Sequence, residues 1–107
     1  MQNAGVFAVP EDLAPHELVR LREAIDRIDE VLVRLLNQRA RYAVEAGHIK
    51  GILQLPVYVP DREKEVLANV ERWSEGPLEP PAVRRLFERI IDESRRVERQ
   101  SAEQETK

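Results

Sequence analysis

The chain of 107 residues has no cysteine and few aromatic residues, with one Trp, two Tyr and two Phe. Without cysteine, disulfide bonds and thiolate catalysis are excluded, and the composition is compatible with a reducing compartment. The scarcity of aromatic side chains removes the residues that contribute most buried area to a compact monomeric core. Because a domain of this size buries only a modest share of its surface alone, self-association is expected.

Long apolar runs and an excess of basic charge are missing too. No stretch approaches the roughly 20 apolar residues that span a bilayer, and the first residues lack the pattern of a secretory signal. The net charge of −3 does not favour nucleic acid as a partner. The two histidines, His16 and His48, lack metal-ligand spacing, and there is no Gly-rich phosphate loop. We therefore expect a cytoplasmic protein without metal or cofactor that binds neither membranes nor nucleic acid.

The chain contains a long apolar stripe with helical spacing. Its members recur at intervals of three and four residues: Leu18, Leu21, Ile25, Ile28, Leu32 and Leu35. No proline interrupts 17–55, so the pattern predicts one helix of about 35 residues, roughly 50 Å long. That length exceeds the diameter of a 107-residue globule, whose radius of gyration is about 13 Å. A partner chain would cover the stripe, and a simple coiled-coil dimer is the alternative.

Two more helices are predicted, which gives an all-α chain of three helices, one of them very long. Pro56 and Pro60 bracket a short extended connection, and Pro60 suits the first turn of a second helix. A loop rich in Gly and Pro begins at Ser74, and a third helix follows. We expect a flexible N-terminal arm over 1–15, a helical domain over 16–100 and a frayed polar tail over 101–107.

Three basic residues of the long predicted helix stand out. Arg39 occupies the apolar stripe, where burial without a partner is unfavourable, although it could pair with another helix or reach water with its charged end. Lys50 lies about three helical turns after Arg39, so both point the same way. Arg22 lies much earlier and at a different azimuth, so the same helix could hardly bring it to the other two, whereas an antiparallel partner chain could. Taken alone, Arg22 and Lys50 fit solvated surface charges.

Residues of the other two predicted helices complete the candidates. Glu98 follows Ser94 by one helical turn on the apolar side of the third helix, either as its polar rim or as a working group in a partly dry site. Arg62 and Glu63 open the second helix, where they could be ordinary first-turn charges. Ser94 has no histidine nearby that could act as its base, which argues against a hydrolase triad.

In their order and separations, three segments resemble the all-helical class of chorismate mutases: LREAIDRIDEVLVRLLNQRARYAVEAGHIK, LPVYVPDREKEVL and RRLFERIIDES. The resemblance covers residues 18–100. It implies an intertwined helical homodimer that rearranges chorismate to prephenate in the biosynthesis of Phe and Tyr, without metal or cofactor. A second enzyme of the shikimate pathway would be a further partner. Two alternatives stay open: an isochorismate-pyruvate lyase of the same fold, and a non-catalytic regulatory or docking dimer.

The resemblance also implies roles for the basic residues of the long helix. Arg22 would be donated across the dimer interface to the partner's site. Arg39 would hold a substrate carboxylate. Lys50 would reach a carboxylate and the ether oxygen of the breaking C–O bond. Together with Glu98, Arg39 and Lys50 would be the catalytic residues.

For the other two helices the resemblance implies the remaining substrate contacts. Arg62 and Glu63 match an Arg-Glu pair whose glutamate holds the ring hydroxyl, and Ser94 would assist at a carboxylate. Glu98 would contact the ether oxygen, and it must be protonated to donate a hydrogen bond there. Val59 departs from the aspartate that some members have near the hydroxyl, so only a backbone contact is expected there.

Overall fold

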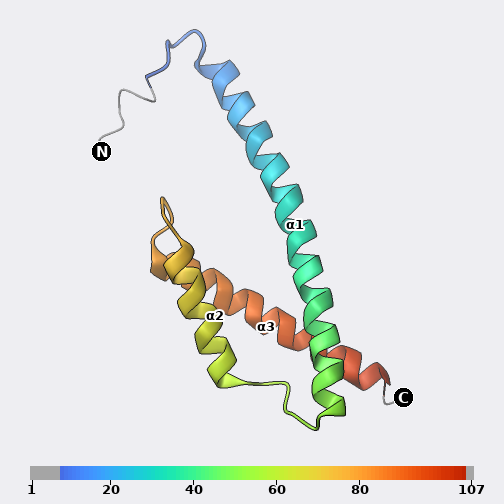
Figure 1. Ribbon diagram of the computed structural model, residues 1–107. Helices are drawn as coiled ribbons and strands as arrows, with labels where there is room; N and C mark the ends of the chain where they lie inside the picture. The colour runs from blue at the N-terminus through green and yellow to red at the C-terminus, as the bar shows by residue number, and fades with distance from the viewer. Residues whose placement is uncertain (1–7, 106–107) are drawn as a thin grey trace. The chain divides into compact units, whose positions relative to one another are not determined.

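A computed structural model describes residues 8–105 of the chain and places three α-helices in this range, with no β-strand in it. The helices are α1 (Ala14–Ile52), α2 (Pro60–Trp73) and α3 (Pro80–Glu105), as Figure 1 shows. The predicted all-α class with one very long helix is confirmed. No helix of the described range is long and apolar enough to cross a membrane.

Both ends of the helical region extend beyond the predicted bounds. The backbone N–H groups of Leu13 and Ala14 donate to the carbonyl of Pro10, and this turn starts α1 at Ala14, inside the predicted 1–15 arm. At the other end α3 continues through Glu105, so most of the predicted 101–107 tail is helical. The tail residues are polar but include good helix formers such as Ala102. Residues 1–7 and 106–107 lie outside the described range.

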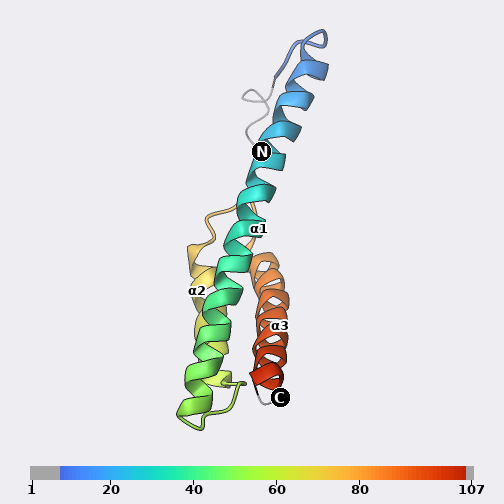
Figure 2. The ribbon, with the colours of Figure 1, turned by 90° about the vertical axis from the view of Figure 1, so that its right-hand side faces the viewer.

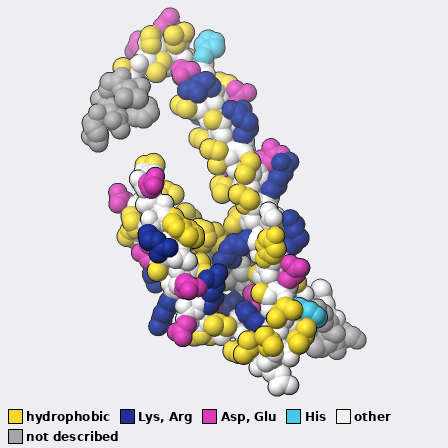
Figure 3. Space-filling model, in the orientation of Figure 1, with side chains coloured by type: hydrophobic (Ala, Val, Ile, Leu, Met, Phe, Trp, Pro, Cys, Tyr) yellow, Lys and Arg dark blue, Asp and Glu magenta, His cyan; other side chains and the backbone are white. Residues whose placement is uncertain are grey.

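The chain divides into two compact units, Met1–Leu35 and Leu36–Lys107, and α1 contributes residues to both. In the first unit, the predicted apolar stripe is exposed. Each of its members has 47% or more of its surface accessible: Leu18, Leu21, Ile25, Ile28, Leu32 and Leu35. Figure 3 shows hydrophobic side chains (yellow) along this part of α1. A stripe of this length needs a cover that the unit itself does not supply.

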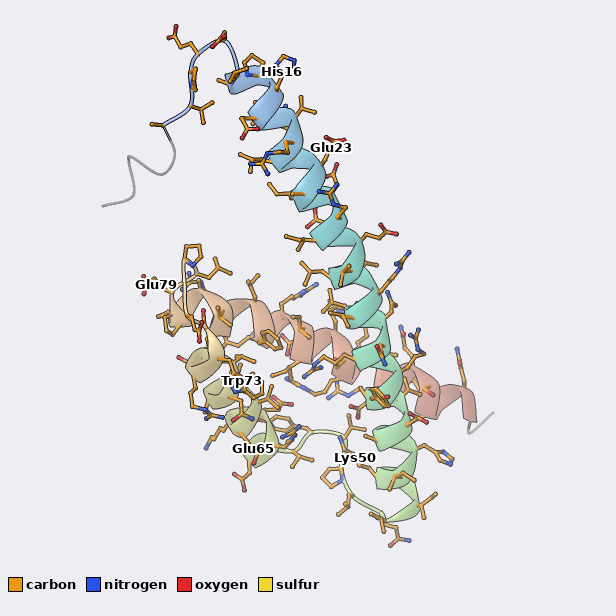
Figure 4. The ribbon with its side chains drawn as sticks, turned by 45° about the horizontal axis from the view of Figure 1, so that its top comes forward. His16, Glu23, Lys50, Glu65, Trp73 and Glu79 are labelled. Atoms are coloured by element: carbon orange, nitrogen blue, oxygen red, sulfur yellow. The ribbon has the colours of Figure 1, made fainter. Side chains whose placement is uncertain are left out.

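The second unit contains the small core of the chain. Leu67 and Val70 of α2 and Ile91 of α3 are buried, and the two helices lie side by side in Figures 1 and 2. An ion pair between Arg84 and Glu71, 3.0 Å long, joins the same two helices. Trp73, at the end of α2, lies outside this core and is 66% exposed (Figure 4).

The start of α2 follows from its sequence. Val59 is the N-cap in an extended conformation, and Pro60 opens the helix, where its missing N–H and fixed φ are tolerated. Asp61 and Glu63 lie in the first turn, where the helix dipole favours acidic side chains. Glu63 is thereby fixed at the end of α2 that faces the connection from α1.

The end of α1 is tied back by a turn. The Leu55 N–H donates to the carbonyl of Lys50 at 2.7 Å, and Gln54 adopts a positive φ of 60°. Gly47, one turn before the end, approaches the Glu98 side chain of α3 closely, since a Cβ built there would lie 3.3 Å from Glu98 Cγ. Side chains of residues 36–52 and of α3 thus meet within the second unit.

Candidate functional site

The second unit forms a cavity of about 340 Å³, partly open to solvent, between the end of α1, the connection to α2, and helices α2 and α3. Figure 3 shows basic side chains (dark blue) gathered where these elements meet. Most of the predicted site residues line it: Arg39, Lys50, Val59, Arg62, Glu63, Ser94 and Glu98. Arg22 does not. It is exposed on the part of α1 that belongs to the first unit.

Arg39 is half-buried in the cavity wall, and its Nη1 donates a hydrogen bond of 2.8 Å to Ser94 Oγ. Burial lowers the pKa of the Arg39 guanidinium, and the nearby charge of Arg62 lowers it further. None of the described residues offers Arg39 a carboxylate within ion-pair distance. Because a guanidinium carries five N–H donors, Arg39 retains the capacity to bind an anion.

Lys50 and Glu98 form a second pair in the cavity. The Lys50 Nζ donates to the Val57 carbonyl at 3.1 Å and lies 3.3 Å from Glu98 Oε2. Figure 4 shows Lys50 near the end of α1, beside the connection that leads to α2. Glu98 is the buried charged residue of the described range, with 8% of its surface exposed. In this arrangement Glu98 accepts a hydrogen bond, whereas the protonated, donating form predicted from the sequence stays a prediction.

The start of α2 contributes the remaining predicted residues. Glu63 is half-buried and pairs with Arg95 of α3, whose Nη2 donates to Glu63 Oε1 at 3.2 Å. Arg62 lines the cavity but is largely exposed, and it also pairs with Glu65 one turn further on. Exposed pairs of this kind contribute little, so the Arg62 guanidinium can exchange this partner for a ligand at little cost.

Sequence reasoning did not identify Arg95 or Gly47 as part of the site. Arg95 lies in a run of charged residues that is typical of a solvated helix face. Its position four residues after the buried Ile91 places it on the inner face of α3, and this spacing was the available signal. For Gly47 no sequence signal separates a close approach to Glu98 from a tolerated helix glycine.

The residues that the structure describes form no metal centre at the cavity. Within 8–105, no three side chains of the His, Asp and Glu types could hold a metal ion together. What the cavity presents is a set of guanidinium and ammonium groups around a mostly apolar wall, with two carboxylates that hold two of the cations. Such a wall suits a small, compact anion.

Comparisons with known proteins agree with this site. The family model of chorismate mutase type II matches residues 21–99. The bifunctional chorismate mutase/prephenate dehydratase of Neisseria gonorrhoeae is 42% identical over 91 residues, which cover 85% of this chain and 23% of that protein. The T-protein of Enterobacter agglomerans is 39% identical, over 79% of this chain and 21% of that protein. The chain thus spans about a quarter of the length of these relatives.

Solved structures match over almost their whole length. A chorismate mutase from Thermus thermophilus (form II) superposes with a TM-score of 0.76 at 35% identity, covering 78% of this chain and 94% of that one. A chorismate mutase from Helicobacter pylori in complex with prephenate gives a TM-score of 0.75 at 26% identity, over 82% and 96% of the two chains. The resemblance seen in the sequence is confirmed: this chain belongs to the chorismate mutase type II family.

Proposed function

We propose that this chain converts chorismate to prephenate, the branch-point reaction toward Phe and Tyr. The observation that carries the proposal is the grouping of Arg39, Lys50 and Glu98 around one cavity, together with membership of the family. The reaction is intramolecular. The ether C–O bond breaks while a C–C bond forms between the enolpyruvyl methylene carbon and the ring, and no proton or electron is exchanged with the protein.

The first task of the site is to select the compact conformation of a doubly negative substrate. Arg39 and Arg62 are the guanidinium groups with donors available for its carboxylates, and Ser94 supports Arg39. Planar, charge-assisted contacts fix both the position and the orientation of a carboxylate. Holding the enolpyruvyl arm over the ring removes the orientational part of the barrier.

The second task is to stabilise the charge that develops on the ether oxygen as the C–O bond breaks. Lys50 and Glu98 are paired across the cavity and can both face that oxygen. Lys50 donates from its ammonium group, and Glu98 donates when it is protonated. A preorganised donor of this kind is typically worth about 3–4 kcal/mol of barrier. Glu63 accepts a hydrogen bond from the ring hydroxyl. Near Val59, only backbone groups are available to bind the hydroxyl.

The proposal includes a homodimer. The exposed stripe of the first unit is the surface that a second copy would cover, and Arg22 lies on the same part of α1. In the dimer, Arg22 of one protomer completes the site of the other, where it adds a third guanidinium for the substrate carboxylates. A further enzyme of the pathway would be an additional partner.

The test is direct. Purified protein is incubated with chorismate, and prephenate is measured by its acid conversion to phenylpyruvate across a range of pH. Formation of prephenate at a rate far above the uncatalysed reaction supports the proposal. If the protein instead releases pyruvate from isochorismate, it is a lyase; if it acts on neither compound, it is a binding dimer. Arg39→Ala serves as the inactive control.

A further inference from the structure

We propose that Arg95 is a positioning residue that holds the Glu63 carboxylate in the orientation in which it accepts the ring hydroxyl of the substrate. The inference rests on the function proposed above and deepens it. Arg95 lines the cavity beside Glu63 and would act on the substrate through that carboxylate, so its effect should depend on the presence of the ring hydroxyl.

The geometry of the pair supports this role. Arg95 Nη2 donates to Glu63 Oε1 at 3.2 Å, and Arg95 Nε lies 2.9 Å from Glu63 Oε2. The Nε–H is buried and is not aligned for a hydrogen bond, so the attraction on that side is between charges alone. Each carboxylate oxygen has two lone pairs, and the pair with Arg95 leaves acceptor capacity for a hydroxyl.

Arg95 is itself held from two further sides. Its guanidinium lies 5.0 Å from the centre of the Tyr58 ring, in the range of a cation–π interaction. Its Nη2 also donates to Asp92 one turn earlier on α3, at 2.8 Å. With 24% of its side chain exposed, Arg95 is more enclosed than an ordinary surface arginine. A side chain held by these contacts can in turn fix the orientation of Glu63.

The surroundings of Glu63 make such support necessary. Val59, at the N-cap of α2, is apolar and its side chain offers no acceptor, and Asp61 is exposed and does not line the cavity. Glu63 and Glu98 are the acidic residues of the lining, and the proposed function assigns Glu98, together with Lys50, to the ether oxygen. Glu63 is therefore the side chain that recognises the hydroxyl, and a freely rotating glutamate would perform this poorly.

The test measures discrimination rather than activity alone. For each variant, kcat/KM is determined with chorismate and with the deoxy analogue that lacks the ring hydroxyl. In Arg95→Leu we expect the ratio of the two values to fall about 10- to 100-fold, as for a lost hydrogen bond to a charged group. In the double variant that combines Glu63→Gln with Arg95→Leu, the ratio should be no lower than in the more affected of the two single variants. If Arg95 had a merely structural role, its replacement would lower kcat/KM for both substrates by the same factor, and the ratio would not change.

Controls keep the outcomes separate. Arg96→Leu, on the exposed side of the same helix, should leave the ratio unchanged. Should Arg95→Leu fail to fold, Tyr58→Leu removes the ring beneath the guanidinium and should lower the ratio several-fold. An unchanged ratio in a folded Arg95→Leu or Tyr58→Leu protein overturns the inference while the proposed function stands. If the unmodified protein does not convert chorismate, the proposed function is wrong, and this inference fails with it.

Discussion

Two glycines of α1 form a matched pair for testing how closely Glu98 must be placed. A Cβ added to Gly47 would lie 3.3 Å from Glu98 Cγ and 3.4 Å from its Oε2. These separations are tighter than ordinary side-chain contacts, so the Glu98 side chain must move by a few tenths of an ångström. A Cβ added to Gly51, one turn later, meets nothing within 4 Å.

The two substitutions by alanine should both favour the helix, with the smaller gain at Gly51 near its end, and they should differ in their effects on the site. Replacing a helical glycine by alanine stabilises a helix by about 0.5–1 kcal/mol, and less near its end. A misplacement of about 1 Å can cost 10²-fold in rate, so a shift of about 0.3 Å should cost roughly fourfold. We therefore expect Gly47→Ala to lower kcat about 3- to 5-fold, and Gly51→Ala to leave kcat unchanged while raising the thermal midpoint.

The assay combines kcat for chorismate with thermal unfolding followed by circular dichroism. The contact with Glu98 should also offset the helix gain of Gly47→Ala, and this offset should disappear in a Glu98→Ala background, where Cγ and the carboxylate are gone. If Gly47→Ala keeps full kcat and gains as much stability as Gly51→Ala, the close approach does not constrain Glu98. The assigned place of Glu98 in the reaction would then lose its geometric support.

Three further outcomes are expected. Arg39→Met should lower kcat/KM at least about 100-fold, as two charge-assisted hydrogen bonds are lost; its thermal midpoint should rise, since a desolvated cation without a carboxylate partner is removed. Because an amide N–H donates without being protonated, Glu98→Gln should retain activity where Glu98→Leu loses it, and equal loss in both variants would exclude Glu98 from the ether contact. Mixing inactive Arg22→Ala with inactive Lys50→Ala protein should restore part of the activity through hybrid dimers, and no recovery after subunit exchange would refute site sharing.

The helices could be predicted because their signals are local. The three- and four-residue spacing from Leu18 onward and the prolines at 56 and 60 specify where helices form and where they stop. Their ends could not be predicted as well. The start at Ala14 depends on a turn in which backbone N–H groups donate to the Pro10 carbonyl. The extension to Glu105 depends on the summed helix propensities of several residues, none of which is a clear signal alone.

Most of the site residues could be predicted only through the resemblance to a known family. Arg39 could be singled out without any related protein, because a charged residue in an apolar stripe needs a physical explanation. Arg95 and Tyr58 are different, because their meaning lies in a distance between α3 and the connection before α2. A pattern of residues along the chain specifies faces of helices, but not which cation of one face meets which carboxylate of another.

The charge of the cavity explains why it contains carboxylates at all, although its proposed guest is an anion. The lining holds four basic residues, Arg39, Lys50, Arg62 and Arg95, against two acidic ones, Glu63 and Glu98. Four cations without carboxylates would repel one another across the cavity, and their side chains would turn away toward water. Glu98 and Glu63 hold Lys50 and Arg95 in place. With Glu98 ionised, the lining from one chain keeps an excess of two positive charges, equal in magnitude to the charge of a dicarboxylate. The Arg95–Glu63 pair can then stay in place on binding, and the free energy of the two guanidinium contacts goes into fixing the substrate's conformation.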